Sequence, residues 1–198
     1  RLAIGTGATT GTGNIGLGIS ALSALIGGTN NIGMGLTAAD AVTTGTDNIA
    51  IGRLAFSAST DGADNIAIGR SALAVSAGVA DCNIAIGKAA MGGADVSGID
   101  NIAIGTTSMD ALTSGICNVA IGTNALGAST TGCRNVAIGV TTMGGADTTG
   151  IDNIAIGRKD SRYYNGEVLE VVMHLSDLEQ HNGSTITNNT IEYYNGYQ

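Results

Sequence analysis

Four aspartates recur at one position of a repeated pattern, and they are the side chains whose type and spacing come nearest to a catalytic arrangement. Asp47, Asp64, Asp100 and Asp152 each stand directly before an asparagine. Paired carboxylates in a cleft can hydrolyse glycosidic bonds, so this column would suit a polysaccharide depolymerase. Asp before Asn is also typical of tight turns, because both side chains bond to nearby backbone groups. We favour turns and expect no catalytic residue, since no nucleophile, base and acid occur together.

Metal ligands do not form a set with suitable spacing. His174 and His181 would share one face of a helix, but no third ligand accompanies them, as a zinc site would require. Gly-Gly-Ala-Asp occurs at 92–95 and 144–147 without the Gly/Asp periodicity of calcium-binding repeats. We therefore expect neither a metal nor a cofactor.

A short repeat must position these side chains. Variants of Asn-Ile-Ala-Ile-Gly occur nine times, 17 or 18 residues apart, and a partial copy opens the chain. A period this short predicts a stack in which each repeat is one coil lying on the coil before it. We therefore predict an all-β fold, a parallel β-roll or β-solenoid of 17–18-residue coils, over residues 1–157. The repeat asparagines are Asn14, Asn31, Asn48, Asn65, Asn83, Asn101, Asn118, Asn135 and Asn153.

The motif alternates between large and small residues. Positions 2 and 4, counted from the Asn, are large and aliphatic, whereas position 3 is always Gly or Ala. A period of two predicts a strand with two different faces, and the Ile and Val face is expected to fill the core. The motif is followed by two variable residues, then by a small residue and usually by a larger apolar one, as in Ala125-Leu126. This pair predicts a second short strand packed against the Ile pair.

The Asn and the Gly of the motif are predicted to shape the coil. A Gly at one point of every coil indicates a positive φ or a crowded corner. An Asn in every coil is expected to satisfy backbone groups and to stack on its neighbours, because a ligand site would need a few special coils. The structural repeat residues include Asn48, Asn65, Asn83, Asn101, Asn118, Asn135, Asn153, Gly52, Gly69, Gly87, Gly105, Gly122, Gly139 and Gly157.

Composition excludes several classes of protein. Proline is absent, and the 32 glycines do not recur at every third residue, which excludes collagen. A net charge of −8 argues against nucleic acid and anionic membrane as partners. No apolar run approaches the roughly 18 residues that a membrane helix needs. We therefore expect no nucleic acid as a partner and no membrane insertion.

Three cysteines lie close to repeat asparagines. Cys82 and Cys117 occupy the same position two coils apart, and a coil spacing of about 4.8 Å would place them beyond disulfide reach. Cys117 and Cys133 lie on adjacent coils and could just meet. We favour three free, half-buried thiols, as in a chain that folds in a reducing cytoplasm.

The core of such a roll is thin, and further burial is expected from other chains. The uniformly tiny position 3 would let a neighbour approach the backbone closely, which predicts a homotrimer packed along the long axis. On this hypothesis, Ala103→Leu harms assembly more than a change at the variable Thr106.

The repeat resembles two related groups of proteins. The coil at 118–126 reads Asn-Val-Ala-Ile-Gly-Thr-Asn-Ala-Leu and is followed by Thr-Thr-Gly at 130–132. This pattern is similar to the head repeat of trimeric autotransporter adhesins, which are trimeric left-handed parallel β-rolls, and to the repeat of bacteriophage tail fibres. The 17–18-residue spacing and the Thr-Thr-Gly turn are closer to the fibre repeat. The resemblance covers residues 1–157 and implies a left-handed homotrimeric roll that serves as a projecting shaft or head.

Residues 158–198 do not follow the repeat and are predicted to form a short α/β C-terminal cap or connector. Val168, Val171, Leu175 and Leu178 form a helical stripe, although Val168–Val172 would also suit a strand. Strands are expected at 185–187 and 190–194. All five tyrosines lie here and are the candidate binding residues, with packing at the trimer cap as the alternative: Tyr163, Tyr164, Tyr193, Tyr194 and Tyr197.

Together these features predict a structural and adhesive component of a phage tail fibre. It would lie on the virion as an extracellular appendage, act without catalysis and project host-recognition elements. The expected partners are two further copies of the chain, other virion tail or fibre proteins, and a host surface glycan or receptor. The alternative is the head domain of a bacterial trimeric autotransporter adhesin at the cell surface, and a polysaccharide depolymerase comes third.

Overall fold

The computed structural model describes residues 10–76, 80–145 and 149–157. The chain divides into two units, Arg1–Asp160 and Ser161–Gln198, and the second unit lies outside the described residues. The predicted cap at 158–198, its helix or strand at 167–180, and all five tyrosines therefore lie outside them as well.

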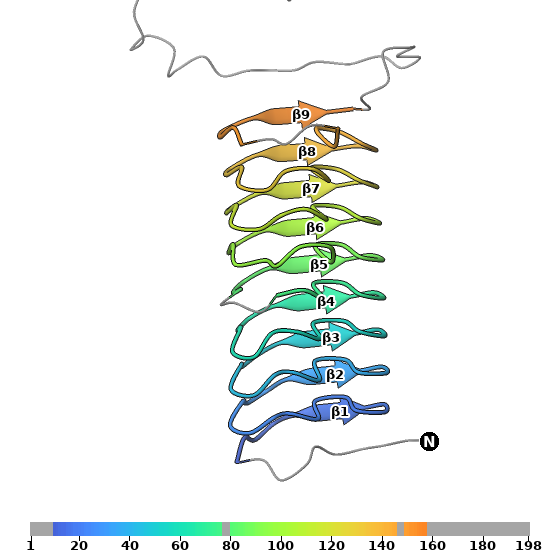
Figure 1. Cartoon of the computed structure of the whole chain (residues 1–198), viewed down its shortest axis with the longest axis vertical. Coiled ribbons are helices and arrows are strands. Elements are labelled where there is room, and N and C mark those ends of the chain that lie inside the picture. Colours follow the sequence, from blue (N-terminus) through green and yellow to red (C-terminus); the bar gives the residue numbers. More distant parts are fainter. Residues whose placement is uncertain (1–9, 77–79, 146–148, 158–198) are drawn as a thin grey trace, which may run out of the picture. The chain divides into compact units, whose positions relative to one another are not determined.

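Nine short parallel strands form one sheet in the order of the sequence, and Figure 1 shows them stacked one above another. Equivalent motif positions pair throughout, for example Ala50 with Ala67 and Ala103 with Ala120. The described residues contain no helix, and the predicted all-β parallel solenoid of 17–18-residue coils is confirmed. The strands are β1 Ile15–Leu17, β2 Ile32–Met34, β3 Ile49–Ile51, β4 Ile66–Ile68, β5 Ile84–Ile86, β6 Ile102–Ile104, β7 Val119–Ile121, β8 Val136–Ile138 and β9 Ile154–Ile156.

Two opposite walls fill the interior of each coil. The strand contributes position 3, which is fully buried in β3 to β8: Ala50, Ala67, Ala85, Ala103, Ala120 and Ala137. The opposite wall contributes larger side chains that are at most 1% exposed: Leu22, Phe56, Leu73, Met91, Met109 and Leu126. A Cβ built on Gly33 would lie only 3.0 Å from Cγ of Leu22, so the two walls are close. The narrow interior therefore accepts large side chains from one wall and little more than a methyl group from the other.

The predicted orientation of the strand was wrong. The small position 3 points into the coil, and positions 2 and 4 point outward, where Ile51 and Ile121 remain 36% and 38% exposed. The bulky side chains of the opposite wall already occupy the interior, so the Ile pair has no room there. Ala103 is therefore packed within its own coil, and Ala103→Leu would disturb that coil rather than a contact between chains.

The second predicted strand is also absent from the described residues. Alternate residues of that segment have positive φ, for example 59° at Leu54 and 51° at Phe56, and the segment forms turns. Its backbone still bonds from coil to coil, and the Phe56 amide donates to the Ala72 carbonyl at 2.9 Å. Its large apolar residues do enter the core as predicted, but they face the small position 3 instead of the Ile pair.

Candidate interaction surface

The repeat asparagines form a continuous ladder inside the roll. Asn31, Asn48, Asn65, Asn83, Asn101, Asn118 and Asn135 are all at most 1% exposed. The Oδ1 of Asn101 accepts the backbone N–H of Asn118 and its Nδ2–H, both at 3.0 Å. The Nδ2 of Asn101 in turn donates to Oδ1 of Asn83 at 3.1 Å and to the Gly115 carbonyl at 2.9 Å.

These hydrogen bonds satisfy both ends of a buried amide and leave no free polar atom for a ligand. From Asn31 to Asn135, each Asn binds the coil before it through the amide ladder and the coil after it through a backbone carbonyl, as Asn48 does with the Gly62 carbonyl at 2.6 Å. A buried polar group is stable only when it is paired in this way. The ladder is therefore part of the scaffold that positions the surface residues.

The motif glycine closes the strand in every coil. Gly52 has φ 133°, and a Cβ on it would lie 2.5 Å from the Gly69 carbonyl oxygen of the next coil. The sequence predicted either a positive φ or a crowded corner for this glycine, and both are found at this position. The turn places the following residue, position 6, on the surface at the end of the strand.

The outward positions 2 and 4 of β1 to β9 form an exposed apolar band, which we call the Ile band. Among its members, Ile15, Ile51, Ile121, Ile138, Ile154 and Ile156 are at least 36% exposed in the single chain. Eight steps of about 4.8 Å and an Ile spacing of about 7 Å give a band of a few hundred Å². The largest apolar patch on the surface of a monomeric protein has about this size and is often functional. This band was not predicted from the sequence, because the large aliphatic residues were expected to fill the core.

A column of acidic residues lies at the amino-terminal end of the strands. Asp47, Asp64 and Asp100 are exposed and have φ between 57° and 59°, a conformation that Asp tolerates in turns. Cys82 occupies the same column, and partial desolvation together with the carboxylates of Asp100, Asp64 and Asp81 raises the pKa of its thiol. Asp47, Asp64 and Asp100 lie on exposed turns, as the turn interpretation predicts.

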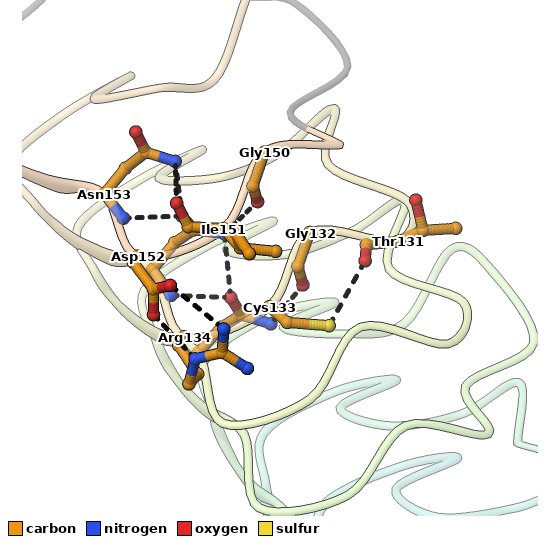
Figure 2. Close-up of polar contacts among 10 residues, drawn as sticks. Thr131, Gly132, Cys133, Arg134, Gly150, Ile151, Asp152 and Asn153 are labelled. Atoms are coloured by element: carbon orange, nitrogen blue, oxygen red, sulfur yellow. Dashed lines mark hydrogen bonds and ion pairs between the residues drawn. The ribbon is translucent and has the colours of Figure 1, made fainter. Parts of the chain in front are cut away.

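Before β8, the acidic column contains Arg134 in place of an aspartate, and Arg134 forms an ion pair with Asp152 of the next coil. Nε of Arg134 donates to Oδ1 of Asp152 at 2.6 Å, and Nη2 donates to Oδ2 at 2.9 Å. Figure 2 shows the two side chains pointing toward one another across adjacent coils. The hydrogen bond from Arg134 lowers the pKa of Asp152, and both side chains are more than half exposed. An exposed pair of this kind contributes little to stability.

Three free cysteines and two aspartates with a buried oxygen atom also lie among the described residues. All three cysteines are free, as predicted, but Cys82 and Cys117 are exposed rather than half-buried. Asp40 and Asp110 each have a buried Oδ1 without a hydrogen-bond partner, and desolvation raises the pKa of both carboxyls. In the part of the chain that the structure describes, no group of three His, Cys, Asp or Glu residues could hold a metal ion.

Two features of this surface were missed by sequence reasoning. The first is the outward direction of the Ile band, for which the alternation in size gives no sign. The second is a basic column at position 6, made by Arg53, Arg70 and Lys88, all of them exposed. Its signal was present in the sequence, because three cations follow the motif glycine in three consecutive repeats.

Comparison with known proteins gives no relative for this chain. No family model, curated protein or solved structure matches it. Across residues 10–76, 80–145 and 149–157, no helix is long and apolar enough to cross a membrane.

Proposed function

We propose that residues 1–157 form the shaft of a phage tail fibre, which holds a host-recognition element away from the virion. The observation that carries this proposal is the uniformity of the roll. The coils of β2 to β8 repeat the same small inward residue, the same buried Asn and the same outward Ile band, and none departs from the others to form a site among the described residues. Such a stack suits a mechanical role, and several copies in one fibre would give multivalent attachment.

The Ile band supports a homotrimer as the working form of this shaft. It extends along β1 to β9 and is exposed in the single chain, so further copies packed along the long axis would cover it. The sequence had indicated position 3 as the contact between chains. Because position 3 is buried within its own coil, the proposed contact is now made by positions 2 and 4. The resemblance to trimeric fibre and adhesin repeats supplies the number three.

Light scattering of the purified chain tests the assembly. A trimer gives three times the chain mass of 19.5 kDa at micromolar concentration. A monomeric mass would contradict both the trimer and the assignment of the Ile band as its contact.

Immunoelectron microscopy with an antibody against the roll tests the location. Label along the tail fibres of virions is the expected result, with other tail or fibre proteins as neighbours. Label on the bacterial envelope would instead favour the alternative, the head of a trimeric autotransporter adhesin. Label on neither surface would overturn both proposals.

A polysaccharide assay tests the proposed absence of catalysis. The purified protein should not cleave host glycans, because the aspartates of the acidic column occupy exposed turns. Cleavage that is lost in Asp64→Asn would favour a depolymerase instead.

A further inference from the structure

The basic column lies at the carboxyl-terminal end of the strands. Arg53, Arg70 and Lys88 follow β3, β4 and β5, and the Ser71 and Ala89 amides donate to the Arg53 and Arg70 carbonyls, so the three residues stack on consecutive coils. Among the described residues, no carboxylate lies within ion-pair distance of these cations. Like charges on adjacent positions of a sheet destabilise it unless an opposite charge is near.

The acidic column lies at the other end of the same coils. Asp47 and Asp64 precede β3 and β4, and Asp81 and Asp100 lie before β5 and β6. Asp47, Asp64 and Asp81 are six or seven residues from the cations of their own coils, which corresponds to roughly 20 Å of extended chain, and the coil of Asp100 carries Thr106 at the equivalent position. The two columns therefore flank the Ile band and cannot pair with each other within one chain.

The direction in which a second copy packs decides which columns meet. If the rotation axis runs along the roll, the amino-terminal edge of one band meets the carboxyl-terminal edge of the next, so acid meets base. If the axis runs along the strands, the copies are antiparallel and acid meets acid. Closed rotational symmetry also keeps equal coils at equal height. Arg53, Arg70 and Lys88 would then lie level with the coils of Asp47, Asp64 and Asp81.

We propose that the basic column of one chain pairs with the acidic column of a second, parallel copy, and that these pairs set the direction and height of packing. The inference rests on the proposed self-assembly. Within the roll, Asp47 accepts a hydrogen bond from Asn30 Nδ2 at 3.0 Å, and Asp81 accepts one from the Ala63 amide at 2.8 Å, but neither carboxylate forms an ion pair with a described residue. The Ile band would supply most of the contact and allow sliding, because apolar burial is not directional. Charge pairs that are confined to the central coils would form at one height only, so they would prevent the copies from sliding along each other.

Charge reversal tests the pairing. The first variant carries Arg53→Glu and Arg70→Glu, and the second carries Asp47→Lys and Asp64→Lys, which stand level with these two cations. Arg134 already occupies the acidic column with φ 54°, so a long cation fits there. Each variant should raise the dissociation constant of the assembly at least about tenfold at low salt. The chain with both sets exchanged should assemble like the wild type.

Two results separate this inference from the proposed function. If the wild type is monomeric, both fail. If it assembles, but both single-set variants assemble equally well, or the exchanged chain does not recover, the charge pairing is wrong while the assembly stands. Circular dichroism confirms that each variant keeps its fold.

Cross-linking tests the direction without altering any charge. Asn30→Cys and Leu36→Cys place thiols at the two ends of β2, in a chain whose native cysteines are changed to Ser. In parallel copies, a short bis-maleimide joins the two sites between chains and gives covalent oligomers on a denaturing gel. Each single variant, as the matched control, should remain monomeric on that gel. A double variant that assembles but yields no covalent oligomers would overturn the parallel arrangement.

Discussion

The inward and outward sides of each strand invert the usual relation between residue size and burial. Ala120 is fully buried, whereas its neighbour Ile121 is 38% exposed. In a thick core the larger side chain is normally the buried one. Here the opposite wall supplies Leu, Met and Phe, so the strand side must be small. The side of a thin roll that a residue occupies is therefore set by the volume left by the opposite wall, and large apolar residues remain outside for another surface to cover.

The largest effect is expected from breaking the inward Asn ladder. Asn101→Ala removes the donor to Gly115 and the acceptor of two Asn118 hydrogens, all of them buried. Unsatisfied buried groups cost about 1–3 kcal/mol each, so the free energy of unfolding should fall by roughly 3 kcal/mol or more. Urea denaturation measures it. The exposed Thr106→Ala serves as the control and should change it by less than about 0.5 kcal/mol. Equal losses would mean that the ladder is not structural.

Enlarging the inward side should be the next most damaging change. Ala120→Leu adds three carbon atoms against the opposite wall, and such overpacking costs about 1–3 kcal/mol. Ile121→Leu on the outward side of the same strand keeps the side-chain volume and should cost under about 1 kcal/mol. Thermal unfolding of the two variants compares them directly. A larger loss for Ile121→Leu would reverse the assignment of the two faces.

Reducing the outward side should impair assembly and spare the coil. Ile121→Thr with Ile138→Thr keeps β-branched residues, so the strands should form as before. About a third of each Ile surface remains to be buried, which corresponds to a loss of about 1 kcal/mol per residue in the contact. Sedimentation should show weaker association while the melting curve at low concentration is nearly unchanged. Unaltered association would exclude these residues from the contact.

The carboxylates near Cys82 should slow the alkylation of its thiol. Asp64→Asn removes one of the charges that raise the pKa of Cys82, after desolvation and Asp100. More thiolate is then present at a given pH, so alkylation by iodoacetamide should be faster. The comparison uses chains in which Cys117 and Cys133 are changed to Ser, with Thr106→Ala as the control. An unchanged rate would mean that the carboxylates do not act on this thiol.

The smallest effect is expected at the exposed ion pair. The pKa of Asp152 is lowered in the folded chain, so its contribution to stability is present above the unfolded pKa of about 3.9 and is lost as the pH falls through the folded pKa. Arg134→Ala should remove this contribution, so the melting temperatures of the two chains should differ slightly at neutral pH and converge in acid. A difference that grows in acid would contradict this sign.

The sequence alone determined the period, the parallel stack and the special residues of the coil, because each is a local requirement repeated nine times. A positive φ at Gly52 and hydrogen bonds for a recurring Asn follow from residue type and recurrence. The paired Ala-Leu at 125–126 likewise indicated an inward Leu, and Leu126 is 1% exposed. The aspartates of the acidic column were likewise visible at a fixed repeat position, whereas the basic column at Arg53, Arg70 and Lys88 was missed although its residues follow the motif glycine in three consecutive repeats.

Only the tertiary structure decided which face of the strand points inward. Alternation of Ile and Ala shows that the two faces differ, but both assignments satisfy it, because the choice depends on the opposite wall. That wall is built from turns with alternating positive φ, a conformation that Leu54 and Phe56 rarely adopt alone and hold here through bonds to adjacent coils. Its large side chains occupy the interior, and the Ile band and the charges beside it are left on the surface.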